Sequence, residues 1–134
     1  MGTWGPKPFE NDDAADFVDE FGEMGADAIV DAIRTVTSGS EDYLEGPEAQ
    51  RAIAACAFVA AAIGDSSALD EVAADAWQGF DGETATLASL KPEAVSALDR
   101  IMSGNSELLE LWEEADAEAL EQFKNEIEAL KKRL

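Results

Sequence analysis

Residues 52–63 read AIAACAFVAAAI, which is the longest apolar run of the chain. Gly46 and Pro47 lie shortly before it. Proline is favoured in the first turn of a helix because an N–H group at that position has no acceptor within the helix, so its absence costs nothing. The run of 12 residues is too short to span a bilayer. A helix that is apolar on all faces is buried on most of them. The run therefore predicts a buried, alanine-rich central helix over residues 47–63.

The rest of the chain has the periodicity of helices. Apolar side chains recur at helical spacing in stretches that cover residues 12–21, 26–37, 67–78, 92–103, 105–115 and 117–134. The last two stretches are either one helix with a kink at Asp116 or two helices. Residues 79–88 are expected to be a loop, in which residues 83–86 are a weak strand candidate. The pattern predicts an all-α protein, a compact orthogonal bundle of six or seven helices around the central helix.

Capping side chains predict the starts of two helices. Ser66 or Ser67 is expected to cap the helix over residues 67–78, and Asn105 the helix over residues 105–115, since both residue types favour this position. In the second helix, four apolar side chains share one face and are expected to point inward: Leu108, Leu111, Trp112 and Ala115.

The length of 134 residues is that of one domain, so residues 1–134 are expected to form a single helical domain. Residues 1–10 contain two glycines and two prolines, which oppose regular structure. Trp4 and Phe9 lie among them, and each such ring buries ~150–250 Å² when it packs. We therefore expect residues 1–10 to be an irregular arm packed on the core.

The C-terminal helix repeats apolar residues at alternating spacings of three and four. This is the seam pattern of a coiled coil. Two heptads are fewer than the three or four that indicate a coiled coil, so packing of this helix on its own domain is the favoured interpretation. A dimer through the C-terminal helix is the alternative. The seam residues are Leu120, Phe123, Ile127, Leu130 and Leu134.

The charge of the chain limits its partners. The sequence has 30 Asp and Glu against 9 Lys and Arg, for a net charge of −21. Binding to nucleic acid depends on cations that neutralise phosphates, and anionic membranes attract basic segments, so neither partner is expected. A basic protein is the expected kind of partner, because complementary potential speeds association. The alternative is that the acids, which occur along the whole chain, adapt the surface to high salt.

The residues needed for several chemistries are missing. There is no histidine and one cysteine, which excludes a histidine-based triad, a zinc finger and an intrachain disulfide. Cys56 lies inside the apolar run and is expected to be a core residue in a reducing compartment. The start of the chain does not read as a secretory signal, so the cytoplasm is the expected location. Neither a phosphate-binding glycine loop nor an EF-hand is present, and no cofactor or metal site is predicted.

The opening of the chain carries a specific motif. Its residues are Gly2, Trp4, Gly5, Phe9, Asn11, Asp12, Asp16 and Phe17. They resemble the start of a bacterial family catalogued as domain of unknown function 4259, whose members open with G-x-W-G-x-x-x-F-x-N-D-x-A-x-D and an aromatic residue. The resemblance extends into the alanine-rich helix and the C-terminal part. It implies a compact, mostly helical protein and brings no activity with it.

The motif also has a physical interpretation. Asn11 can cap the first helix, and Asp12 and Asp16 lie one turn apart on it, where they can bind backbone N–H groups or the Trp4 indole. An N-terminus that locks onto its own core is the favoured interpretation. A functional site built on Asp12 and Asp16, or a partner-binding edge, is the alternative.

Three functions are compatible with these features. The leading hypothesis is a non-catalytic acidic interaction module, similar to an immunity protein or antitoxin, that binds a basic partner. The second is a carboxylate-based hydrolase or metal-dependent enzyme, which requires convergent acids in a pocket and a raised carboxyl pKa. The third is a structural protein with a salt-adapted surface.

Overall fold

The structure is a computed structural model that describes Thr3, residues 5–38 and residues 43–134. Within these residues the chain forms eight helices and no strand, so the all-α prediction is confirmed. The helices are α1 (Asp12–Met24), α2 (Ala26–Ser38), α3 (Gly46–Ile63), α4 (Glu71–Gln78), α5 (Thr84–Ala88), α6 (Lys91–Ile101), α7 (Glu107–Glu114) and α8 (Ala117–Arg133). The predicted count of six or seven was too low, because α5 occupies part of the expected loop.

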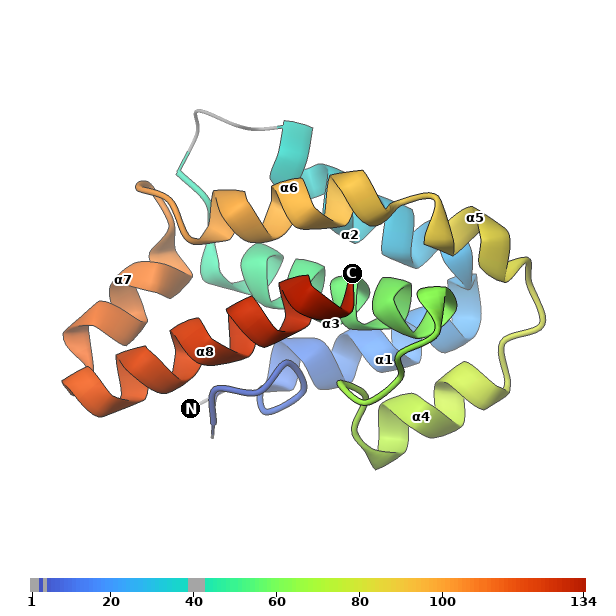
Figure 1. Cartoon of the computed structure of the whole chain (residues 1–134), viewed down its shortest axis with the longest axis horizontal. Coiled ribbons are helices and arrows are strands. Elements are labelled where there is room, and N and C mark those ends of the chain that lie inside the picture. Colours follow the sequence, from blue (N-terminus) through green and yellow to red (C-terminus); the bar gives the residue numbers. More distant parts are fainter. Residues whose placement is uncertain (1–2, 4, 39–42) are drawn as a thin grey trace.

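Helix α3 contributes the largest share of the core. Each residue from Ala52 to Ala60 is at most 2% exposed, and five of these nine residues are alanines. Small side chains let neighbouring helices approach closely, and α3 contacts α1, α2, α5, α6, α7 and α8. In Figure 1, α3 crosses the middle of the view between α6 and α1, behind α8.

An aromatic cluster joins α3 to the N-terminal part of the chain. The Phe58 ring stacks on Phe21 with centroids 4.3 Å apart, and it meets Phe9 edge-on at 5.8 Å. Phe17 and Trp77 lie 6.3 and 6.2 Å from the same ring. Such pairs stabilise a fold by about 0.5–1.5 kcal/mol each beyond the area that they bury. The arm, α1 and α4 are thereby packed on one residue of α3.

The segment between α3 and α6 differs from the sequence-based prediction. Helix α4 begins at Glu71 rather than at residue 67, and its cap is Asp70, whose Oδ1 accepts from the Ala73 N–H at 2.8 Å. Residues 65–67 form a turn in which the Ser67 N–H donates to Asp65 Oδ1 at 3.0 Å. Residues 84–86, part of the strand candidate, belong to α5, which buries Leu87.

The start of α7 also differs by one residue. Asn105 has a φ of 61°, in the left-handed region where asparagine is tolerated, so it cannot be the cap, which needs extended backbone. Ser106 caps the helix instead, with Oγ 3.5 Å from the Leu109 N–H. Of the two alternatives at Asp116, a kink or a new helix, the structure has the new helix, because Asp116 Oδ1 accepts from the Ala119 N–H at 2.7 Å and α8 begins after it.

Helix α8 packs on its own domain. The side chains of Phe123, Ile127, Leu130 and Leu134 are buried, and α8 contacts α3, α6 and α7. Trp112 of α7 stacks on Phe123, with centroids 5.3 Å apart and an interplanar angle of 10°. Four of the five seam residues are therefore covered within the chain, and a dimer through α8 would have to use its other face.

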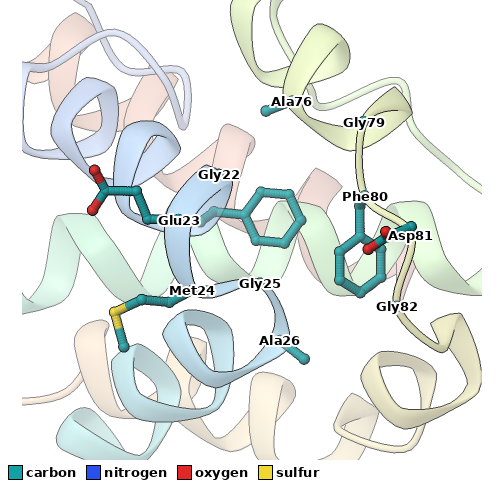
Figure 2. Close-up of a pocket in the computed structure, with 11 residues that line it drawn as sticks. Gly22, Glu23, Met24, Gly25, Ala26, Ala76, Gly79, Phe80, Asp81 and Gly82 are labelled. Carbon is teal, nitrogen blue, oxygen red and sulfur yellow. The ribbon is translucent and has the colours of Figure 1, made fainter.

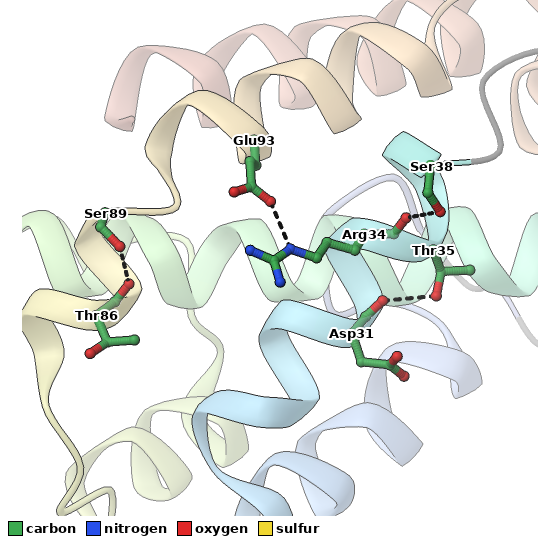
Figure 3. Close-up of polar contacts among 7 residues, drawn as sticks. All are labelled: Asp31, Arg34, Thr35, Ser38, Thr86, Ser89 and Glu93. Atoms are coloured by element: carbon green, nitrogen blue, oxygen red, sulfur yellow. Dashed lines mark hydrogen bonds and ion pairs between the residues drawn. The ribbon is translucent and has the colours of Figure 1, made fainter.

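Ion pairs on the surface connect helices that are distant in sequence. Figure 3 shows Arg34 of α2 reaching Glu93 of α6, with Nε 3.1 Å from Oε2. Exposed pairs of this kind contribute about 0–1 kcal/mol each. Among the described residues, further pairs between helices or turns are Arg51–Glu20, Lys131–Asp99 and Arg133–Asp65. Among the described helices, none combines the length and the apolar character that crossing a membrane requires.

Candidate functional site

Three residues of the opening motif, Phe9, Asn11 and Phe17, are buried in the fold. Gly2 and Trp4 lie outside the described residues. Phe9 and Phe17 are buried against α3. A Cβ at Gly5 would meet the carboxylate of Glu10, which would have to move aside. That carboxylate accepts from the Lys7 N–H at 3.1 Å, which tightens the arm.

Asn11 holds the arm, α1 and α3 together. Its Oδ1 accepts from the Ala14 N–H at 2.8 Å, which is the predicted cap. Its Nδ2 donates to Pro8 O at 3.3 Å and to Gln50 Oε1 at 3.0 Å. Asn11 is 1% and Gln50 7% exposed, and buried polar groups need such partners. The sequence analysis missed Gln50, although it is a polar residue in the otherwise apolar α3.

Asp12 and Asp16 do not form a site together with other side chains of the described chain. Both are exposed on α1, and neither carboxylate has a hydrogen-bond or ion-pair partner within residues 5–38 and 43–134. Asp12 lies in the first turn, where a carboxylate is stabilised by the helix dipole. A contact with the Trp4 indole lies outside the described residues.

The Cys56 thiol and the Asp65 carboxyl group have pKa values shifted away from those that catalysis uses. The Cys56 thiol is fully buried, its Sγ is 3.6 Å from Ala94 O, and burial raises its pKa. Hydrogen bonds from the Ser67 hydroxyl and N–H lower the pKa of Asp65, whereas a general acid needs a raised carboxyl pKa. Among the described residues, no three acids or cysteines converge into a metal site.

An apolar hollow lies beside α7. It measures about 260 Å³ and is lined by Thr3, Leu108, Leu111, Trp112 and Ala115, which we call the α7 patch. Leu108 is buried, but Leu111 is 57% exposed although its side chain is entirely apolar. Figure 1 places α7 at one end of the molecule, beside the start of α8.

Carboxylates surround the α7 patch. Residues 101–123 contain seven acids and neither lysine nor arginine. The Tyr43 hydroxyl donates to Glu110 Oε1 at 2.9 Å, and this hydrogen bond raises the pKa of Tyr43 to about 12. The negative charges of Glu107 and Glu114 contribute to the same shift in pKa, so they lie near the Tyr43 ring. The Glu107 carboxylate also accepts from the Gly46 N–H at 2.6 Å.

A second cavity lies at the other end of the molecule. It measures about 360 Å³ and is formed by the α1–α2 turn and the segment between α4 and α5. We call it the glycine cleft, and Figure 2 shows its residues: Phe21, Gly22, Glu23, Met24, Gly25, Ala26, Ala76, Gly79, Phe80, Asp81 and Gly82.

Two adjoining hollows lie between the N-terminal arm and the turn after α3, and the smaller one also borders α8. They measure about 390 and 190 Å³ and share Lys7, Ser67 and Ala68. Arg133 Nε donates to Ser67 Oγ at 2.8 Å and lies 3.7 Å from Asp65 Oδ2. The guanidinium therefore serves to attach the end of α8 to the turn after α3.

The chain matches a known protein family over most of its length. The family model described as a domain of unknown function (DUF4259) matches residues 2–126. The chain belongs to this family. No curated protein and no solved structure matches it. The description of the DUF4259 family names no activity.

Proposed function

We propose that this DUF4259 protein is a non-catalytic interaction module that binds a basic protein through the α7 patch. The observation that carries the proposal is the exposed Leu111 at the edge of an apolar hollow, surrounded by glutamates. An immunity-like or antitoxin-like role, in which an acidic protein neutralises a basic one, is the form of interaction that we favour.

The apolar part of the α7 patch supports a binding role. A single exposed leucine is ordinary on a protein surface. Here Leu111 adjoins the half-buried Trp112 and a hollow of about 260 Å³. Interface hot spots combine such an aromatic anchor with a pocket and a polar rim. In the α7 patch, Trp112 is the aromatic residue and the hollow is the pocket. The polar rim consists of Glu107, Glu110 and Glu114, which lie on the same short helix.

The charge around the patch supports a basic partner. Residues 101–123 contain seven acids and no base, and the Arg100 guanidinium, bonded to Gly104 O and Asn105 O, is the base next to the start of α7. Complementary charge speeds encounter and rejects acidic competitors, and it does so most strongly at low salt. We therefore expect the partner to present an apolar side chain flanked by lysines or arginines.

Three further expectations belong to this proposal. The protein acts in the cytoplasm, which is supported by the free thiol of Cys56. Its helices form one orthogonal bundle around α3, which is supported by the contacts of α3 with six other helices. The salt-adapted surface remains the competing explanation of the acidity, since acids also occur on α1, α2 and α4.

Affinity capture tests the proposal. The full chain is immobilised and exposed to a lysate of its native host near the host's own salt concentration, beside an unrelated protein of equal net charge. We expect one basic protein to be retained in stoichiometric amount by this chain and not by the control. Retention of the same basic proteins by both would contradict the proposal and favour the salt-adapted surface.

A further inference from the structure

The glycine cleft lies at the opposite end of the molecule from the α7 patch and has a different chemistry (Figure 1). Its volume of about 360 Å³ falls in the range of small-molecule sites, which begins near 300 Å³. Four of its lining residues are glycines, so backbone rather than side chains forms much of its wall. The cleft is therefore wide enough for a small ligand or for one long side chain of a partner.

Aromatic rings form the inner wall of the cleft. The Phe80 ring is half-buried and lies 5.3 Å from the Phe21 centroid and 5.5 Å from that of Trp77, on which it stacks. Phe21 in turn stacks on Phe58. The faces of such rings carry partial negative charge, and a cation within about 6 Å of a centroid is attracted to them.

The rim of the cleft is acidic and lacks a counter-ion. Asp81 follows Phe80 directly, and its carboxylate has no ion-pair or hydrogen-bond partner within the described chain. Figure 2 shows Glu23 and Met24 projecting away from Phe80, which leaves Asp81 as the carboxylate beside the ring. None of the lining residues is a lysine or an arginine.

We propose that the glycine cleft binds an organic cation, an ammonium or guanidinium group on a short apolar stem. The stem would pack on the glycine backbone of the cleft, and the cationic head would lie over the half-buried Phe80 ring near Asp81. Charge complementarity selects this occupant, because the wall combines aromatic faces with an unpaired carboxylate in a chain of net charge −21. The site does not depend on the α7 patch, so the two proposals can fail separately.

Two probes of equal shape test the inference. Choline carries a trimethylammonium head, and 3,3-dimethylbutan-1-ol is its uncharged analogue. Each is titrated into the ¹⁵N-labelled full chain, and the amide signals of Gly25, Gly79 and Gly82 are followed. We expect choline to shift these signals with at least about fivefold tighter binding than the alcohol, as a cation–π contact of ordinary strength implies.

Two variants locate the cation. Phe80→Leu keeps an apolar side chain but removes the aromatic face, and we expect it to abolish the preference for choline over the alcohol. Asp81→Asn changes an exposed side chain without affecting packing, and it should weaken choline binding severalfold and reduce its salt dependence. Glu71→Gln removes a charge from an exposed position of α4 outside the cleft and is the matched control.

The result that would overturn the inference is equal affinity for choline and the alcohol, which would make the cleft a merely apolar pocket. Choline-induced shifts spread over all acidic helices, and unchanged by Asp81→Asn, would also overturn it, because they indicate non-specific attraction to the net charge. So would the absence of any shift at the three glycines.

Discussion

The Phe80 ring lies so close to the backbone of Gly82 that a Cβ at position 82 would be 2.6 Å from Cζ and 2.8 Å from Cε1. The same ring faces Gly25 across the cleft, where an added Cβ would lie 3.5 Å from Cε1. Gly25 also has a φ of 62°, which glycine adopts most easily. The position of the Phe80 ring thus depends on two glycines that belong to different turns.

Replacing Gly82 by alanine is expected to displace the Phe80 ring. Because overpacking commonly costs about 1–3 kcal/mol, Gly82→Ala should lower the free energy of unfolding by an amount in that range. Urea unfolding measures the change. Gly22→Ala is the control from the same cleft, since a Cβ at Gly22 meets nothing within 4 Å and lies within α1. This control should stabilise the chain by about 0.5–1 kcal/mol.

Removing the Asn11 side chain is expected to destabilise the protein more than removing an ordinary helix cap. Asn11→Ala loses the cap of α1 and also leaves Gln50 Oε1 without its donor in a buried place. We expect a loss of about 2–4 kcal/mol in the free energy of unfolding. Asp70→Ala removes the cap of α4, where the side chain accepts only from the Ala73 N–H, and should cost about 1 kcal/mol. Equal losses would mean that the bond to Gln50 contributes nothing.

The Cys56 thiol is expected to be inert in the folded protein. It is fully buried, and its pKa is raised by burial, so neither access nor ionisation favours attack on a thiol reagent at neutral pH. The rate of labelling should follow the rate of unfolding and increase steeply with denaturant. Fast labelling under native conditions would show that α3 is not buried at this position.

Tyr43 is expected to titrate at unusually high pH. Its hydroxyl bonds Glu110, which raises its pKa to about 12 from an ordinary value of about 10. The hydrogen bond therefore stabilises the fold fully below pH ~10, and this contribution disappears as the pH rises towards 12. The chain has one tyrosine, so tyrosinate absorbance reports this group alone.

Two variants of α7 test the cause of this shift. Glu110→Ala removes the acceptor and should bring the Tyr43 pKa down towards about 10. Glu113→Ala removes a charge from the same helix that does not contribute to the shift, and it should leave the Tyr43 pKa nearly unchanged. The opposite order would show that the carboxylates around Tyr43 are arranged differently.

The predictions that the structure confirms rest on short-range sequence signals, which are helix caps and the spacing of apolar residues. The cap at Asn11 and the inward face of α1, with Phe17 and Phe21, follow from residues within two turns of each other. The new helix after Asp116, one of the two alternatives there, also has a local cause, because the Asp116 side chain caps it. The bond from Asn11 to Gln50 spans 39 positions and depends on how α1 packs on α3, so local patterns could not reveal it.

The errors arise where packing decides between alternatives. Helix α5 has five residues, too few to show a period, and it is recognisable only because Leu87 is buried against the core. Leu111 was expected to point inward with Leu108, but it is 57% exposed. Among the described helices, α7 packs mainly against α3 and α8, which lie on its inner side. The candidate surface was therefore found from the structure.

The most direct test of the proposed function compares two substitutions of exposed apolar residues. Leu111→Gln alters the α7 patch, and Val72→Gln alters α4 at a position that is 62% exposed, so neither should perturb the fold. Each variant is used beside the wild-type chain to capture the basic partner from the native host. We predict that Leu111→Gln loses the partner and Val72→Gln retains it in full. Equal capture by both variants would contradict the assignment of the α7 patch as the binding surface.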